Sequence, residues 1–335
     1  MGPDIAFRPP RPEELADCAL VWHESVNEYM ARLGHPLPPP VLEPAVRLGE
    51  HLLATDPDHY RVAVKRGGSG RPDRIVGFGI GLQREHVWSL SQLYVLPAEQ
   101  HRGVGRALLS LVLPSAPEAG AADVTADGPD RRPGVLATCT DSAQPISNGL
   151  YSKLGIVARM PVFNLVGRPR SPSTLPALPA GIEAVPLEPA EKLSHRNPAG
   201  PGRVELEQTI DIIDRDVLGY AHQPDHLFLR VQGRTGFLYR TSGGEPLGYG
   251  YSSQVGRFGP VAVLDETLMA PVIGHLLTAI EPRGAASVWV PGANDRAMVA
   301  LLRAGLRIEG FPAMFCWTRP FAAFERYLPA GLALL

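Results

Sequence analysis

The sequence predicts an α/β fold of the α+β kind, in which two similar halves each form a mixed, mostly antiparallel sheet flanked by helices. Apolar runs with strand periodicity alternate with amphipathic helical segments in much the same order in both halves. A stretch rich in Pro and Ser, without apolar periodicity, separates the halves at residues 168–180. We therefore expect an N-terminal domain over residues 1–167 and a C-terminal domain over residues 181–335.

The first half is predicted to follow the order β-α-α-β-β-β-α-β-α-β. Its three central strands form a meander, and the turn "GGSGRPD" separates the first two of them. A segment at residues 114–134 has no strong periodicity and is expected to be a mobile loop. Strands are expected at residues 5–8, 60–66, 74–83, 86–96, 134–141 and 158–167, and the main helices at residues 12–33, 103–113 and 144–155.

The second half repeats much of this order. Strands are expected at residues 181–187, 226–232, 235–241, 246–254, 259–265, 286–292 and 313–319, and helices at residues 204–219, 266–280 and 294–306. The recurrence indicates one α/β unit that is used twice.

The bulk composition excludes several classes of partner. The net charge is -2, with 32 Lys and Arg residues against 34 Asp and Glu residues, so the chain lacks the basic excess of a nucleic-acid binder. Its three cysteines are far apart and fit neither a disulfide framework nor a paired zinc motif. No apolar stretch approaches the roughly 20 residues of a membrane span, and the N-terminus lacks an apolar signal core. We expect a soluble, cytoplasmic monomer or homodimer without nucleic-acid or membrane partners.

A glycine-containing turn joins a predicted strand to a leucine-rich helix. The sequence "EQHRGVGRALL" places Gly103 and Gly105 at the helix start. Backbone N–H groups converge at such a turn and the helix N-terminus adds partial positive charge, so the turn suits a phosphate, which a Cβ would hold away. Arg102 and Arg106 can add charge at the rim. The alternative is a simple helix-start turn, because the same glycine spacing recurs inside a strand at residues 74–79.

The strand end "LYVLP", this turn and the later "QPISNGLYSKLG" resemble the acyl-CoA-binding and C-terminal motifs of the GNAT N-acetyltransferase superfamily. The resemblance covers about residues 5–167 and implies the GNAT fold, with acetyl-CoA as cosubstrate and no metal. It further implies that the turn cradles the coenzyme A pyrophosphate, while the preceding strand pairs with the pantetheine and the acetyl carbonyl. The implied coenzyme-binding residues are Leu93, Tyr94, Val95, Gln100, His101, Arg102, Gly103, Val104, Gly105, Arg106, Gln144 and Tyr151.

The segment "QPISNGLYSKLG" is similar to the family pattern Asn-x-x-Ala-x-x-x-Tyr-x-x-x-Gly. The resemblance implies that Tyr151 is the general acid that protonates the departing coenzyme A thiolate. A phenol with a reference pKa of about 10 is protonated at neutral pH and can still give its proton to a thiolate beside it. The alternative is a tyrosine that only packs on a helix face. Gln144 replaces the usual Asn and can still form a hydrogen bond.

No residue is an obvious general base. Many family members use a carboxylate on the strand before the turn, but this strand has Gln92, which cannot accept a proton. Glu24 and Glu28 lie on the early helices that line the acceptor site in the family, and Glu85 and His86 lie at the start of the strand. We select Glu24 and His86, since the reference pKa of a histidine is about 6.5. For all four the alternative is a solvated surface charge, and a chain of water molecules can replace any side chain.

The second half retains the helix spacing without the functional residues. "NDRAMVALLRAG" repeats the spacing of "QPISNGLYSKLG", with Leu301 in the place of Tyr151. Where the glycine turn would stand, "LDETLMAP" carries Asp265 and Glu266, whose charges repel a phosphate. We expect a degenerate GNAT-like domain that covers the acceptor site, buries an interface or stabilises the first half.

Together these features predict an acetyl-CoA-dependent N-acetyltransferase with its active site in the N-terminal half. The acceptor is expected to be a primary amine of a small molecule or peptide. Two alternatives stay open: a sensor that binds acyl-CoA without turnover, and a structural pseudoenzyme that binds no coenzyme. Transfer assays with a panel of amines distinguish the first, and thermal-shift titration with coenzyme A distinguishes the second.

Overall fold

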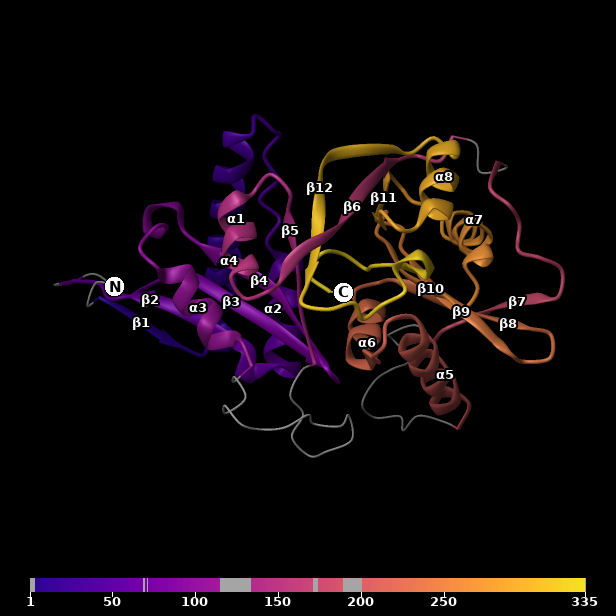
Figure 1. Cartoon of the computed structure of the whole chain (residues 1–335), viewed down its shortest axis with the longest axis horizontal. Helices are drawn as coiled ribbons and strands as arrows, with labels where there is room; N and C mark the ends of the chain where they lie inside the picture. Colours follow the sequence, from indigo (N-terminus) through magenta and orange to yellow (C-terminus); the bar gives the residue numbers. More distant parts are fainter. Residues whose placement is uncertain are drawn as a thin grey trace. The chain divides into compact units, whose positions relative to one another are not determined.

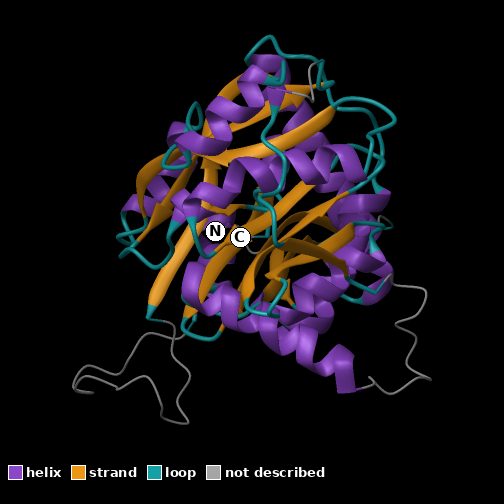
Figure 2. Ribbon diagram, turned by 90° about the vertical axis from the view of Figure 1, so that its right-hand side faces the viewer, coloured by secondary structure: helices purple, strands orange, loops and turns teal. Residues whose placement is uncertain are grey.

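The computed structural model describes residues 4–68, 70, 72–114, 134–170, 174–188 and 201–334, with the backbone alone at 201–203. Contacts divide the chain into two compact units, residues 1–136 and 137–335. Strands with helices packed against them make up both units (Figures 1 and 2). The predicted mobile loop lies almost entirely outside the described residues, as does a short part of the predicted linker.

The first unit contains an antiparallel sheet with the strand order β1-β2-β3-β4. The register between β3 and β4 shifts from the pair Ile80 and Gln92 to the pair Gly81 and Leu90, so β4 carries one extra residue at Ser91. Such a bulge bends a strand and redirects its backbone groups. The strands are β1 (Ile5–Arg8), β2 (Tyr60–Lys65), β3 (Arg74–Arg84) and β4 (Val87–Val95).

Three helices accompany this sheet: α1 (Leu15–Arg32), α2 (Glu43–Thr55) and α3 (Val104–Val112). Helix α3 packs on the face of β3 that carries glycines, since a Cβ at Gly77 would lie 3.2 Å from Leu108 Cδ1. Phe78 and Ile80 alternate with those glycines, point to the opposite face and are buried. The glycines therefore allow α3 to lie close to the sheet directly after the turn that follows β4.

The second unit contains two runs of antiparallel strands, in the orders β5-β12-β6-β11 and β13-β10-β9-β8-β7. The short strand β13 was not among the predicted strands. The strands are β5 (Val135–Asp141), which begins two residues before the unit does, β6 (Val157–Gly167), β7 (Ile182–Pro186), β8 (Thr235–Thr241), β9 (Pro246–Ser252), β10 (Phe258–Val263), β11 (Ala286–Pro291), β12 (Arg307–Trp317) and β13 (Tyr327–Leu328).

Two strands of this unit exchange partners between the sequence halves. Strand β6 closes the first half and β12 closes the second, and sequence order alone would place each beside the preceding strand of its own half. Instead β12 lies between β5 and β6, so that Phe315 is opposite both Cys139 and Met160. Backbone hydrogen bonds thereby join the end of the first half to the second. For this reason the contact division falls after residue 136, ahead of the sequence boundary expected at residue 167.

The helices of the second unit are α4 (Pro145–Ser152), α5 (Pro201–Val217), α6 (Gln223–Val231), α7 (Met269–Ala279) and α8 (Asp295–Arg303). Helices α7 and α8 contribute Ile273, Leu276 and Leu301 to a core that also takes Val261 and Val288 from the strands. No helix in the described part of the chain has both the length and the apolar character needed to cross a membrane.

One predicted element is wrong: residues 226–232, expected as a strand, belong to α6. Leu227, Leu229 and Val231 alternate along the sequence and imitate a strand. Burial follows the helical period instead, since Leu229 is buried while Leu227 and Val231, one turn apart, are exposed. Pro224 in the first turn also suits a helix start. The other predicted helices and strands are present with shifted ends, so the predicted α/β fold is confirmed.

Candidate active site

The turn between β4 and α3 has a backbone suited to an anion. Gln100 is extended, while His101 and Gly103 have positive φ angles of 62° and 82°. The first helical hydrogen bond runs from the Ala107 amide to the Gly103 carbonyl at 3.0 Å. The three amides before Ala107 therefore lack an intrahelical acceptor, and no side chain caps the helix. Consecutive amides in such a conformation form an anion-binding concavity.

The conformation of Gly103 and the space beside it make glycine the suitable residue at this position of the turn. The φ of Gly103 lies in the left-handed region, and a Cβ there would meet no described atom within 4 Å, so the space beside it is open. A Cβ on Gly105 would lie 3.7 Å from Val95 Cγ2. A side chain on Gly103 would project into open space that a phosphate can otherwise occupy. The open space beside Gly103 thus lets an anion approach the backbone amides of the turn.

Among the described residues, the turn has one buried carboxylate, and two basic side chains pair with it. Glu99 is buried, with Lys65 Nζ at 2.6 Å and Arg102 Nη1 at 3.2 Å. Arg106 is exposed on the first turn of α3. The two cations that pair with Glu99 prevent its charge from repelling an anion at the turn.

Two side chains, one from the turn and one from α1, form hydrogen bonds with the end of β4. Gln100 Nε2 donates a hydrogen bond to the Val95 carbonyl oxygen at 2.9 Å, and Ser25 Oγ on α1 donates to the same oxygen at 3.1 Å. Leu93, Tyr94 and Val95 are half-buried. The predicted coenzyme-binding residues of the strand and the turn are therefore brought together within the first unit.

Tyr151 and Gln144 belong to the second unit. Tyr151 is buried on α4, and its carbonyl accepts a hydrogen bond from the Ile156 amide at 3.2 Å. Gln144 is the N-cap residue of α4 but its side chain does not cap the helix. Its backbone carbonyl oxygen accepts hydrogen bonds from the backbone amide and from the side-chain Nδ2 of Asn148. The side chain of Gln144 is thus not committed to the helix start.

The acetyltransferase (GNAT) family model matches residues 22–155, a range that includes the turn and most of α4 with Tyr151. Residues 22–155 are a GNAT acetyltransferase domain. This confirms the predicted family for that part of the chain. No curated protein matches the chain in sequence.

Solved structures extend the similarity to the second half. A putative acetyltransferase from Pyrococcus horikoshii has a TM-score of 0.68 and 16% identity, covering 100% of this chain and 97% of its own. A GCN5-related N-acetyltransferase from Sphaerobacter thermophilus has a TM-score of 0.55 and 16% identity, covering 96% of this chain and 98% of its own. A tandem GNAT protein from the clavulanic acid biosynthesis pathway has a TM-score of 0.52 and 15% identity, covering 95% and 99%. The whole chain therefore has a tandem GNAT fold, as predicted.

Of the predicted bases, the structure brings only one near the end of β4. Glu24 directly precedes Ser25 on α1, and Arg74 Nη2 lies 3.3 Å from its carboxylate. His86 stands before the first residue of β4, nine residues from Val95. At about 3.3 Å for each strand residue, it lies roughly 25–30 Å from that end of the strand. Within the GNAT domain the geometry favours Glu24 over His86.

The two other bases that the sequence left open lie in simple surroundings. Glu28 pairs with Arg32 one helical turn later at 3.0 Å. Glu85 lies beside His86 in the β3–β4 turn, with a positive φ of 47°. Glu28 is thus a half-buried charge on a helix surface, and Glu85 is an exposed charge in a tight turn.

The second GNAT fold lacks an open turn at the equivalent position. The Asp265 side chain accepts a hydrogen bond from the Thr267 amide at 2.8 Å and so caps the short 3-10 helix that precedes α7. Glu266 pairs with Arg296 at 3.1 Å. Leu301, in the place of Tyr151, is fully buried in the core. The Asp265 carboxylate thus already accepts the hydrogen bond of an amide that a bound phosphate would need.

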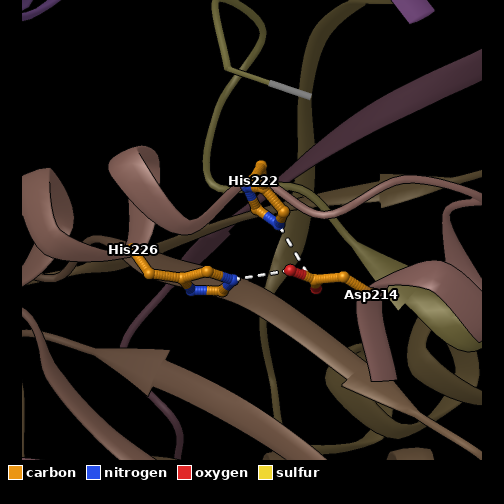
Figure 3. A group of neighbouring side chains, drawn as sticks. All are labelled: Asp214, His222 and His226. Carbon is orange, nitrogen blue, oxygen red and sulfur yellow. Dashed lines mark hydrogen bonds and ion pairs between the residues drawn. The ribbon is translucent and has the colours of Figure 1, made fainter. Parts of the chain in front are cut away.

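Sequence reasoning missed a group of titratable side chains in the second unit. The carboxylate of Asp214 on α5 contacts both His222 and His226 at the start of α6 (Figure 3). The signal that could have revealed it is the spacing His-x-x-x-His, which places two imidazoles on one face of a helix. The misassigned strand at residues 226–232 concealed this spacing.

Proposed function

We propose that this protein is an acetyl-CoA-dependent N-acetyltransferase that acylates a primary amine of a small molecule or peptide. The observation that supports this best is the turn of residues 100–106 in a GNAT domain, with its positive-φ glycine and its unengaged helix-start amides. GNAT chemistry needs a pyrophosphate cradle next to a strand end that can pair with the acyl carrier. The first half offers both, so the reaction is assigned to residues 1–167.

The coenzyme is held mainly by backbone groups in this proposal. The amides of Val104, Gly105 and Arg106 bind the pyrophosphate, and the Arg102 and Arg106 side chains add charge from the rim. His101 shapes the turn through its positive φ. The main chain of Leu93 to Val95 pairs with the pantetheine, and Gln144 supplies a side-chain hydrogen bond at the thiol end.

The acyl transfer follows from these groups. The neutral amine attacks the thioester carbonyl carbon, so that a C–N bond forms and the C–S bond breaks. A backbone N–H of β4 stabilises the oxyanion. Tyr151 gives its proton to the departing thiolate, and the ammonium that forms on the acceptor loses a proton to Glu24 or to water. Products are the amide and free coenzyme A.

The second GNAT fold has a structural role in this proposal. Its carboxylate-capped helix start and its buried leucine leave neither a phosphate site nor a general acid. It contributes walls or contacts while the first half binds one coenzyme.

An acyl-CoA sensor without turnover is the second candidate, and one observation favours it. Gln92, paired with Ile80 on β4, stands where many relatives carry a carboxylate base. Its amide cannot accept a proton from the acceptor amine. Transfer to a panel of primary amines decides between the two: coenzyme binding without acetylated product for any amine supports the sensor.

The experiment that tests the coenzyme site is the substitution Gly103→Val, followed by calorimetric titration with acetyl-CoA. The branched side chain opposes a positive φ and fills the cradle, so the affinity is expected to fall well over tenfold, roughly 1.4 kcal/mol or more. Gly244→Val is the matched control, because Gly244 has a φ of 90° and equally open surroundings in the second unit. Equal affinities of both variants and the wild type would refute the assignment of this turn.

A further inference from the structure

A buried group of three ligand-type side chains, none of which has a role in the proposed acyl transfer, lies in the second unit. Asp214 comes from α5, His222 is the N-cap residue of α6, and His226 lies in the first turn of the same helix. The carboxylate is fully buried, and each imidazole is about 2% exposed. Figure 3 shows both imidazoles directed at the carboxylate.

Two of the distances among the donor atoms, one to each oxygen of Asp214, are close to those around a tetrahedral ion. His226 Nε2 lies 2.9 Å from Asp214 Oδ2, and His222 Nε2 lies 3.4 Å from Asp214 Oδ1. One ligand atom from each residue lies within 4.8 Å of the other two. A zinc ion with bonds of about 2.0–2.1 Å at tetrahedral angles separates its ligand atoms by about 3.3 Å. Side-chain shifts of a few tenths of an ångström close the difference for the two printed pairs.

The atoms next to the second nitrogen of each imidazole resemble those found around metal-binding histidines. A histidine that binds a metal through one nitrogen usually offers the other to an oxygen, which fixes the ring. His226 Nδ1 lies 3.1 Å from the Tyr251 hydroxyl, and His222 Nδ1 lies 3.8 Å from Asp225 Oδ2. Both rings therefore direct Nε2 at Asp214 and Nδ1 at an oxygen.

A fourth donor atom, an oxygen, lies beside the three ligands. The Tyr249 hydroxyl on β9 donates a hydrogen bond to Asp214 Oδ1 at 2.6 Å and lies 3.5 Å from His222 Nε2. This oxygen, or a water molecule held by it, can complete four-coordination. The set of two imidazoles with carboxylate and hydroxyl oxygens suits Zn²⁺ better than the all-oxygen preference of Mg²⁺ or Ca²⁺.

A buried hydroxyl nearby lacks a partner. Tyr327 on β13 is fully buried, and its hydroxyl has no hydrogen-bond partner among the described residues. The carboxylates of Asp214 and Asp225 act on it electrostatically. A buried hydroxyl without a protein partner costs free energy, so this part of the second unit can accommodate a further polar ligand.

We propose that Asp214, His222 and His226 bind one divalent transition-metal ion of the zinc type, which joins α5 and α6 to β9. The two buried carboxylates of Asp214 and Asp225 balance the double positive charge of the ion. The site is closed by burial, as structural zinc sites are, and does not depend on the acyl-transfer assignment.

The test uses the full chain without an affinity tag, with Zn²⁺ and Co²⁺ as probes. Metal content is measured by mass spectrometry on protein as purified, and then after chelator treatment and titration. We expect about one Zn²⁺ per chain and, with Co²⁺, the intense visible absorption of a four-coordinate site. Wild-type chain that binds neither ion, or shows only the weak spectrum of six-coordinate Co²⁺, overturns the proposal without any variant.

Variants locate the site. His226→Gln and Asp214→Asn are expected to weaken Zn²⁺ binding by at least about 100-fold and to abolish the Co²⁺ spectrum. His275→Gln is the control, since His275 lies on α7 in the same unit and contacts the Tyr239 hydroxyl at 3.0 Å instead. Zn²⁺ should raise the melting temperature of the wild type and of the His275→Gln control, but not of the two ligand variants. Unchanged Zn²⁺ affinity in either ligand variant, with circular dichroism showing a folded chain, contradicts the assignment.

Discussion

The carbonyl oxygen of Val95 accepts a hydrogen bond from Gln100 Nε2 at 2.9 Å, so the last residue of β4 is anchored by the side chain that opens the following turn. Ser25 on α1 donates to the same oxygen at 3.1 Å. One backbone oxygen therefore fixes three elements: the strand end, the turn and the helix that carries Glu24. Because this oxygen already accepts two hydrogen bonds, the turn amides and the other backbone groups of the strand end are the groups that can contact a coenzyme.

This relationship predicts the effect of changing Gln100. Gln100→Ala removes one anchor while Ser25 keeps the other, so the acetyl-CoA affinity should fall about 5- to 10-fold, or about 1 kcal/mol. Gln100→Glu should cost more, because a carboxylate faces a carbonyl oxygen and repels the phosphates. Calorimetric titration measures both. Gln83→Ala is the control, because Gln83 Nε2 also donates to a backbone carbonyl, at the opposite end of β4.

The general-acid assignment predicts a selective loss of turnover. Tyr151→Phe keeps the packing of α4 but removes the proton donor, so kcat for amine transfer should fall roughly 10- to 1000-fold while the coenzyme dissociation constant stays within about twofold. Tyr239→Phe removes another buried hydroxyl of the same unit and should leave kcat unchanged. A kcat for Tyr151→Phe within twofold of wild type shows that this tyrosine only packs.

Local patterns in the sequence predicted most of the fold and the turn. The glycines at 103 and 105 predict a helix start, and the alternation in β3 predicts a strand. Both patterns depend on only a few neighbouring residues, so the sequence alone reveals them. The exchange of β6 and β12 could not be predicted in this way. Both strands contain apolar residues, and nothing in their sequence patterns indicates which of the two pairs with β5.

The buried group around Asp214 shows a second limit of sequence reasoning. Its carboxylate and imidazoles come from two helices, and no local sequence pattern predicts that α5 and α6 bring them together. The alternation of Leu227, Leu229 and Val231 moreover favours a strand, and the burial of the other helix face overrode that pattern.

A half-buried ion pair near the start of the first unit contributes to its stability in a way that depends on pH. Arg8 donates two hydrogen bonds to Glu14 at 2.6 and 2.7 Å and thereby holds the pKa of Glu14 at about 2, against an ordinary value of 4.5. A lowered pKa stabilises the folded chain above the unfolded value, and this contribution is lost as the pH falls from about 4.5 towards about 2.

Glu14→Gln should therefore destabilise the chain at pH 7 by about 1–3 kcal/mol. The difference from wild type should shrink as the pH falls below about 4.5, which denaturant melts at several pH values can measure. Glu43→Gln is the control, since Glu43 pairs with Arg47 on an exposed helix surface, where such pairs contribute about 0.3–0.5 kcal/mol. A difference between Glu14→Gln and wild type that is constant with pH contradicts this account.

The division of labour between the two GNAT folds predicts one acetyl-CoA per chain. In the second fold the Asp265 carboxylate already holds the Thr267 amide at 2.8 Å, and Leu301 fills the core where a proton donor would stand. A second pyrophosphate would have to displace a carboxylate from that amide and face the charge of Glu266. The titration stoichiometry of the wild type should therefore be about one, and Gly103→Val should abolish that single binding event at the same concentrations. A stoichiometry of two, or one remaining full-affinity site in Gly103→Val, would assign coenzyme binding to the second half and reverse the roles proposed for the two folds.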